Sequence, residues 1–121
     1  MTVVKSAKHY DLEERTLSFA KEVIAFVKIL PKTTANLEIS KQVIRSSGSV
    51  GANYIEANEA LGKKDFAMRI KICRKEAKES IYWLKLLEAR GEEAEKRKQS
   101  LISEATELMK IFGSIVEKLK S

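Results

Sequence analysis

The segment QVIRSSGSVGANYIEANE, at residues 42–59, decides the fold of this chain. When the segment is projected as a helix at roughly 100° per residue, its apolar and polar residues separate onto two faces. The broad apolar face contains Ile39, Val43, Ile44, Val50, Tyr54, Ala57 and Leu61. A narrow polar stripe on the other side contains Gln42, Arg45, Ser49, Asn53 and Glu56. The pattern predicts a long amphipathic helix.

Small residues occupy the middle of this predicted helix, at Gly48, Ser49, Gly51 and Ala52. Two glycines inside a helix destabilise it by about 1 kcal/mol each relative to alanine. Because the sequence keeps them, we expect another backbone to approach closely at this point.

Apolar residues with helical spacing recur in four segments, separated by short breaks. They predict helices at about residues 11–30, 37–61, 65–90 and 94–120. Pro31 ends the first helix, because a residue that precedes proline is disfavoured in helical geometry. Gly62 and Gly91 are predicted to end the second and third helices, and Asp65 is predicted to cap the start of the third. The start of the fourth helix lies in the charged segment 92–100.

Length and composition favour one all-α domain over residues 1–121. The chain has 121 residues, the size of a single domain with a substantial core. One Pro and five Gly disfavour long loops and a β-rich fold. Helices of 20 to 25 residues are about 30–37 Å long, and short turns force each one to run back along its predecessor. We therefore predict an antiparallel up-down-up-down four-helix bundle.

The cysteine content and the N-terminal segment favour a cytoplasmic protein. Cys73 is the single cysteine, which excludes an intramolecular disulfide and fits a reducing compartment. The N-terminal residues MTVVKSAKHY contain no continuous apolar run, so we expect no signal peptide. No segment approaches the roughly 20 apolar residues of a membrane span, and we expect no membrane partner.

The sequence offers little support for catalysis. His9 is the only histidine, which excludes a His-based metal cluster and disfavours a Ser-His-Asp arrangement. The segment SSGSVGAN is rich in small residues, but no strand precedes it and no GK[ST] follows, so a phosphate loop is disfavoured. Cys73 falls on the predicted core face and fits a small hydrophobe better than a nucleophile. We expect no enzyme activity, no catalytic residue, no metal and no cofactor.

The predicted third helix carries a second apolar stripe, roughly 140–160° from its main apolar face. The stripe consists of Met68, Ile72, Tyr82 and Leu86. A single bundle does not readily bury both sides of one helix, and a self-association surface would explain the stripe. The alternative is a set of scattered surface hydrophobes, which are normal. We favour a homo-oligomer with this stripe as its interface.

The same helix carries a basic strip, within an arc of roughly 100°. The strip consists of Lys64, Lys71, Arg74, Lys75, Lys78 and Lys85. Residues 63–85 contain eight basic and three acidic side chains, a balance of +5 in a chain whose net charge is +6. Such a strip can neutralise backbone phosphates, and the alternative is an ordinary solvated face. Tyr82 is the only aromatic residue near it, at its margin, so we expect minor base stacking and weak sequence selectivity.

The polar stripe of the second helix has two interpretations. Arg45, Asn53 and Glu56 can form a buried, paired network across a helix contact, completed by Arg69 and Glu76 of the third helix. The stripe can equally be an exposed edge that awaits a partner. We favour the structural network.

Three segments of the chain resemble one protein family: LPK (30–32), QVIRSSGSVGANYIEANEA (42–60) and KDFAMRIKICRKEAKESIYWLKLL (64–87). They resemble the bacterial four-helix-bundle family of ribosomal-RNA intervening-sequence proteins. The matching motif positions are Gln42, Arg45, Ser49, Ala52, Asn53 and Glu56. The chain departs from the family in reading EANEALGKKD where a Glu-Gly-x-x-Arg ending is common.

The resemblance implies a homopentameric, barrel-like assembly of four-helix bundles with a basic surface. Members are encoded within intervening sequences of large-subunit ribosomal RNA genes. A related branch, the accessory variability proteins of diversity-generating retroelements, binds nucleic acid and a reverse transcriptase. We therefore predict a non-enzymatic, homo-oligomeric accessory protein that binds RNA or DNA mainly through phosphates. The alternative is a protein-interaction scaffold with no nucleic-acid role.

Overall fold

The computed structural model describes the backbone of residues 3–120 and the side chains of residues 12–120. This part of the chain forms four helices and no strand. The helices are α1 (Val3–Lys28), α2 (Thr34–Asn58), α3 (Lys63–Leu86) and α4 (Glu92–Leu119). The predicted all-α class with four helices is therefore confirmed, although α1 begins well before residue 11.

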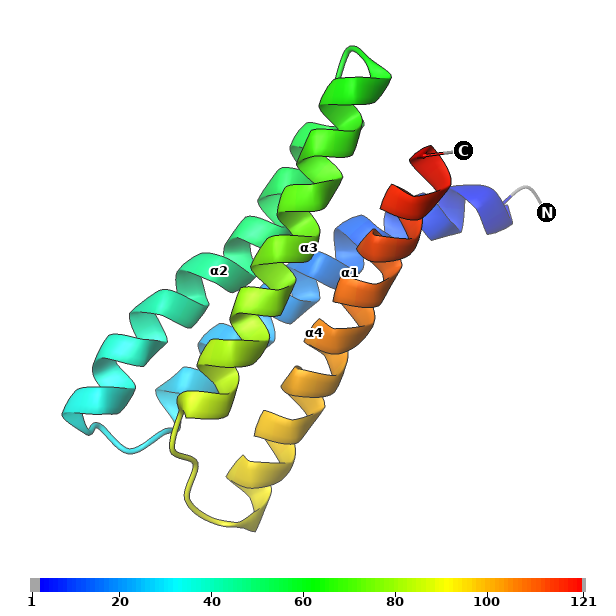
Figure 1. The fold of residues 1–121 in the computed structure, drawn as a ribbon. Coiled ribbons are helices and arrows are strands. Elements are labelled where there is room, and N and C mark those ends of the chain that lie inside the picture. Colours follow the sequence, from blue (N-terminus) through cyan, green and yellow to red (C-terminus); the bar gives the residue numbers. More distant parts are fainter. Residues whose placement is uncertain (1–2, 121) are drawn as a thin grey trace.

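Each helix packs against two others in a closed cycle (Figure 1). α2 lies between α1 and α3, and α4 contacts both α3 and α1. The contact between α2 and α3 is the most extensive, and the contact between α1 and α4 is the least. The α1–α2 and α3–α4 connections lie at one end of the molecule, and the α2–α3 turn projects at the other end (Figure 1).

Local hydrogen bonds explain the first connection. The N–H groups of Ile29 and Leu30 donate to carbonyls three residues earlier, which tightens the last turn of α1 before Pro31. Thr33 then caps α2, because its hydroxyl oxygen accepts a hydrogen bond of 3.0 Å from the Asn36 N–H. This cap places the start of α2 at Thr34, before the predicted residue 37.

The α2–α3 turn corrects two predicted caps. α2 ends at Asn58, so Gly62 does not end that helix, and it instead precedes α3 in extended backbone with φ −144°. α3 begins at Lys63, which places Asp65 inside its first turn rather than at the cap position. The carboxylate there still favours the helix, since the N-terminus of a helix carries partial positive charge.

The α3–α4 connection corrects a third cap. α3 ends at Leu86, with Leu87 as its C-cap, so Gly91 does not end it. Gly91 instead precedes α4 with φ +93°, a conformation that glycine adopts without steric cost. Gly62 and Gly91 are therefore the residues directly before the starts of α3 and α4.

The core lies between the four apolar faces. Its largest fully buried side chains include Phe26, Phe112, Ile70, Leu84, Leu87 and Leu108. Tyr54 packs against Phe112 with ring centroids 5.8 Å apart. Two residues predicted on the apolar face of α2 are instead exposed, Ile44 to 40% and Leu61 to 101%. The buried face of α2 is narrower than its apolar arc, and Leu61 lies beyond the end of the helix.

Packing requires only one of the two glycines in α2. A Cβ atom at Gly51 would lie 2.9 Å from Oγ1 of Thr16 in α1, closer than real contacts allow. A Cβ atom at Gly48 would have no atom of another element within 4 Å. The predicted close approach is therefore confirmed at Gly51 and wrong at Gly48.

Candidate nucleic-acid interface

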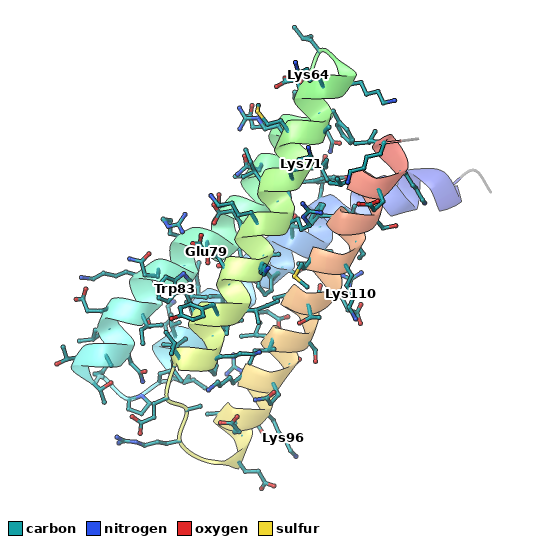
Figure 2. The ribbon with its side chains drawn as sticks, in the orientation of Figure 1. Lys64, Lys71, Glu79, Trp83, Lys96 and Lys110 are labelled. Atoms are coloured by element: carbon teal, nitrogen blue, oxygen red, sulfur yellow. The ribbon has the colours of Figure 1, made fainter. Side chains whose placement is uncertain are left out.

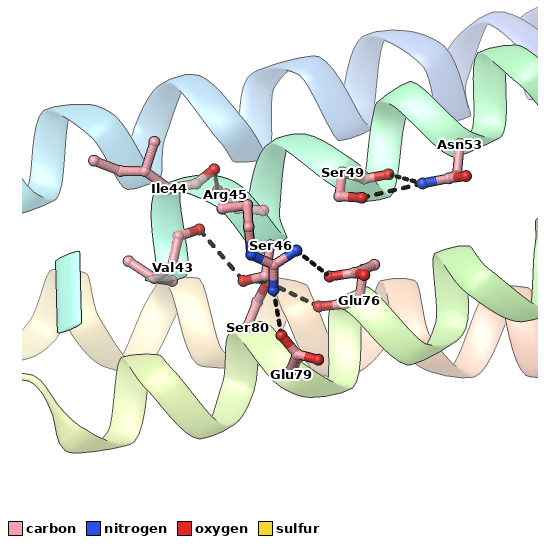
Figure 3. A network of polar contacts seen from close by, with 10 residues as sticks. Val43, Ile44, Arg45, Ser46, Ser49, Asn53, Glu76, Glu79 and Ser80 are labelled. Atoms are coloured by element: carbon pink, nitrogen blue, oxygen red, sulfur yellow. Dashed lines mark hydrogen bonds and ion pairs between the residues drawn. The ribbon is translucent and has the colours of Figure 1, made fainter. Parts of the chain in front are cut away.

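The edge of α3 that faces α2 carries a polar network centred on Arg45 (Figure 3). The Arg45 guanidinium donates to carboxylate oxygens of Glu76, at 3.4 Å, and of Glu79. Glu76 is buried, whereas the Arg45 side chain is 52% exposed. One arginine of α2 therefore pairs with both glutamates of α3.

Two buried hydroxyl groups extend this contact. Ser46 and Ser80 share a hydrogen bond of 2.8 Å between their Oγ atoms, and Ser80 also donates to the Glu76 carbonyl at 2.9 Å. Both serines are fully buried. Their small, satisfied side chains let α2 and α3 pack closely without leaving a buried polar group unpaired.

Asn53 forms the second part of the network. Its Nδ2 donates to the carbonyl and the hydroxyl oxygen of Ser49, at 2.9 and 3.1 Å. Its Oδ1 accepts a hydrogen bond of 3.0 Å from Arg69 of α3. The structure thus brings three members of the polar stripe together with residues of α3.

Gln42 and Glu56, the remaining members of the polar stripe, lie outside this network. Both are exposed, and their side chains make no hydrogen bond or ion pair with other residues in the range 12–120. The polar partners that α3 offers along this edge are already bound by Arg45 and Asn53. Neither side chain therefore takes part in the network that Arg45 and Asn53 form, and for these two residues the exposed edge that awaits a partner stays a prediction.

The basic strip lies on the outer surface of α3. Lys64, Lys71, Lys75, Lys78 and Lys85 are exposed. Arg74 is half-buried, and its Cδ lies 3.6 Å from the point where a Cβ of Gly113 in α4 would lie. Figure 2 shows Lys64 and Lys71 along α3, with Lys110 on the neighbouring helix α4.

The six cations of the basic strip are not used by the bundle. Within residues 12–120, none of them forms an ion pair or donates a side-chain hydrogen bond. The two nearby glutamates of α3 point to Arg45 instead. The charge of the strip is therefore not neutralised by the fold.

The second apolar stripe of α3 is largely uncovered. Met68, Tyr82 and Leu86 are 50%, 58% and 48% exposed, and Ile72 is half-buried. Tyr82 packs edge-on against Trp83, with ring centroids 5.1 Å apart and an interplanar angle of 69°. The Trp83 Nε1 atom is buried and has no hydrogen-bond partner in the described part of the chain.

A second ion-pair cluster, which the sequence did not reveal, joins α1 to α4. Arg15 donates to both carboxylate oxygens of Glu104, at 2.7 and 2.9 Å, and to Glu107 at 2.7 Å. These hydrogen bonds, that to Glu104 first, raise the pKa of the Arg15 guanidinium. Arg15 and Glu104 are 89 positions apart, so no local pattern could have paired them.

The thiol of Cys73 is buried in the core. Burial raises the pKa of the Cys73 thiol to about 12, so the thiol is neutral near pH 7 and a poor nucleophile. No group of three His, Cys, Asp or Glu residues suited to a metal occurs among the described residues, and the side chain of His9 lies outside them. No described helix has the length and apolar character needed to cross a membrane.

Comparisons with known proteins identify the family. A model of the 23S rRNA-intervening sequence protein family matches residues 8–114. Among solved structures, a protein of unknown function from the S23 ribosomal protein family of Bacteroides thetaiotaomicron is 34% identical, with a TM-score of 0.75. The match covers 87% of this chain and 97% of that one. A search of curated proteins found no match. The resemblance seen in the sequence is confirmed, and the chain belongs to the family of 23S rRNA-intervening sequence proteins.

Proposed function

We propose that this protein is a non-enzymatic, homo-oligomeric accessory protein that binds RNA or DNA mainly through the phosphate backbone. One observation carries the proposal: six cations on one rigid helix have no partner within the described fold, while the glutamates beside them are held by Arg45. Lysines of this kind release counterions when they meet phosphates, which favours binding. The net charge of +6 supports an acidic partner.

A homo-oligomer is the second part of the proposal. Met68 and Leu86, each about half exposed, support a self-association surface to which Ile72 also belongs, with Tyr82 at its border with the basic strip. We propose that antiparallel up-down-up-down bundles form a barrel-like assembly of five subunits, by the family resemblance. The connections at alternating ends in Figure 1 support the antiparallel arrangement. A cytoplasmic location is supported by the free thiol of Cys73.

A protein-interaction scaffold is the alternative function. The same uncovered apolar stripe favours it, because such patches also bind other proteins. In that case the lysines serve only to keep the surface hydrated, and nucleic acid binds weakly or not at all.

Salt titration of nucleic-acid binding tests the main proposal. The variant Lys71→Gln, Lys75→Gln and Lys78→Gln removes three cations from the basic strip. The slope of log affinity against log salt is about −0.9 per phosphate neutralised on duplex DNA and about −0.7 on single strands. We expect the triple variant to flatten the slope by about two to three units, with the fold and the oligomer unchanged.

A matched control removes the same charge elsewhere. Lys21→Gln, Lys28→Gln and Lys32→Gln change three exposed lysines in and just after α1. We expect this control to keep the slope of the parent protein within one unit. An absence of binding near 50 mM salt, or equal slopes for both triple variants, would favour the scaffold instead.

Light scattering tests the oligomer separately. The parent protein should have a mass several times the 13.7 kDa of one chain. Met68→Glu or Leu86→Glu should lower that mass, because a charge placed in an apolar contact must be desolvated. A parent monomer at micromolar concentration rules out the oligomer, and an unchanged mass in both variants moves the interface elsewhere.

A further inference from the structure

Tyr82 occupies an unusual position on the outer surface of α3. Its side chain is 58% exposed, and no other aromatic residue belongs to the exposed large hydrophobic residues of the described chain. Lys78 lies four residues before it and Lys85 three residues after it, which places all three on neighbouring turns of one helix face. Both lysines are exposed and unpaired within the described part of the chain.

The angular position of Tyr82 places it at the border between the apolar stripe and the basic strip, since Met68 and Lys78 lie about 40° from it on opposite sides of a helical projection. At about 100° per residue, Tyr82 projects within about 20° of Lys71 and of Lys75. On the same projection it lies about 80° from Ile72 and about 40° from Leu86. The ring therefore lies beside cations of the basic strip, with the apolar stripe on one side of it.

Trp83 packs against the tyrosine ring. The two rings meet edge-on with centroids 5.1 Å apart, a favourable geometry for aromatic pairs. The indole is half-buried and its Nε1 atom is fully covered, so Trp83 provides a fixed side wall for the more exposed ring. A ring fixed in this way loses little conformational entropy when a flat group stacks on it.

The sequence predicts only minor base stacking at the margin of the basic strip. From the exposure of the Tyr82 ring and its contact with Trp83, we propose instead that Tyr82 is a base-stacking residue that, with Lys78 and Lys85 beside it, makes the basic strip prefer single-stranded over duplex nucleic acid. The proposal rests on the proposed nucleic-acid binding and names its substrate class. In a duplex the bases are stacked on one another and their faces are covered. A single strand exposes base faces, and an aromatic side chain can stack on them while neighbouring lysines contact the flanking phosphates.

The test compares strand forms and Tyr82 variants. Single-stranded RNA, single-stranded DNA and a DNA duplex of the same length are titrated against the parent, Tyr82→Leu and Tyr82→Phe at one salt concentration. Tyr82→Leu should weaken single-strand binding by about 5- to 150-fold, the range expected for one stacked base, and should leave duplex binding within about twofold. Tyr82→Phe keeps the aromatic ring and should bind single strands about as tightly as the parent protein.

Leu86→Ala is the matched control for a role of Tyr82 in self-association. It truncates a side chain of the apolar stripe with 48% exposure, close to Tyr82 on α3. If Tyr82 stacks on bases, the Tyr82→Leu protein keeps the oligomeric mass of the parent and loses its preference for single strands. Leu86→Ala then keeps the parent's ratio of single-strand to duplex affinity, whether or not it lowers the oligomeric mass. If both variants dissociate the oligomer and lose binding in parallel, Tyr82 is an interface residue and the proposal is wrong.

Trp83 provides a direct spectroscopic readout, because it is the only tryptophan in the chain. A base that stacks on Tyr82 should change Trp83 fluorescence with single strands, and a duplex should change it much less. The signal should be lost in Tyr82→Leu and kept in Tyr82→Phe. Equal responses to single strands and duplex overturn the stacking proposal but leave phosphate binding intact, whereas no binding of any strand at low salt overturns both.

Discussion

The two edges of α3 differ in what the fold does with their charges. On the edge that faces α2, Glu76 and Glu79 bind Arg45, and Ser80 shares a hydrogen bond with Ser46 (Figure 3). On the outer surface, the six cations of the basic strip have no partner within the described residues. Polar groups in a helix contact must be satisfied, whereas exposed lysines stay hydrated and keep their charge available. Whether a charged side chain has a partner in the fold, rather than its residue type, therefore shows whether it serves the structure or is free to bind another molecule.

The largest expected effect on stability is at the edge of α3 that faces α2. Arg45→Ala leaves the buried Glu76 carboxylate without its cation, and we expect the free energy of unfolding to fall by about 2 kcal/mol. Loss of a partner from a fully buried pair costs about 3–5 kcal/mol, and the half-exposed guanidinium reduces that figure. Urea unfolding measures the change. Glu56→Ala, on the same stripe but without a contact, should stay within about 0.5 kcal/mol, and equal losses in the two variants would break the comparison.

The glycines of α2 provide a second contrast, between a position that packs against another helix and one that does not. Gly51→Ala places a Cβ 2.9 Å from Thr16 Oγ1, and we expect a loss of about 1–2 kcal/mol through overpacking. Gly48→Ala meets no atom of another element, so it should gain up to about 1 kcal/mol from helix propensity. Thermal or urea unfolding of both variants checks the signs. A destabilising Gly48→Ala would indicate that an oligomer contact uses this face.

Arg15 tests whether ion pairing alone, or burial of the paired carboxylate, determines how much stability an arginine contributes. The Arg15 side chain is 25% exposed, less than that of Arg45 at 52%. Its partners Glu104 and Glu107, however, are 30% and 66% exposed, whereas Glu76 is 9% exposed. Arg15→Ala therefore leaves carboxylates that water can hydrate, and it should cost about 1 kcal/mol or less. Salt should weaken this loss, because exposed charges are screened within about 3 Å at 1 M ionic strength. We expect Arg45→Ala to keep most of its effect in 1 M NaCl and Arg15→Ala to lose most of its own. The same salt response in both would contradict the difference in burial.

The smallest effect on stability belongs to the basic strip. Lys78→Ala removes an exposed side chain with no partner in the described fold, and we expect less than about 0.5 kcal/mol of change. The same variant should flatten the salt dependence of nucleic-acid binding by about one unit, as one phosphate contact is lost. A marked loss of stability with unchanged binding would place Lys78 among the structural charges.

The helices themselves could be predicted, and their ends could not. Four amphipathic periods predicted four helices, because the spacing of apolar residues is a local property. Gly62 and Gly91 were assigned as helix ends but precede helix starts, since a glycine in a short connection can serve either neighbour. Thr33 could have indicated the start of α2, because threonine is a common N-cap residue and its hydroxyl accepts a hydrogen bond from the N–H of Asn36, three residues later.

The candidate site was predictable in composition but not in pairing. The basic strip and the apolar stripe follow from helical spacing on α3, and their side chains are exposed except those of Ile72 and Arg74, which are half-buried. The polar stripe of α2 divides in a way that spacing did not reveal: Arg45 and Asn53 reach partners on α3, and Glu56 remains exposed. Tyr82 could be assigned to either stripe until its exposure and its contact with Trp83 were known.

The sequence by itself determined four amphipathic helices, the membership in one family and the concentration of positive charge on α3. Only the tertiary structure decided which charges pair between helices, because those pairs join residues far apart in the chain, such as Arg15 and Glu104. It also decided that Gly51 is required and Gly48 is not, since a close approach depends on where α1 lies. Helical periodicity depends on neighbouring residues alone, whereas ion pairs and steric contacts depend on distances that exist only after the helices pack.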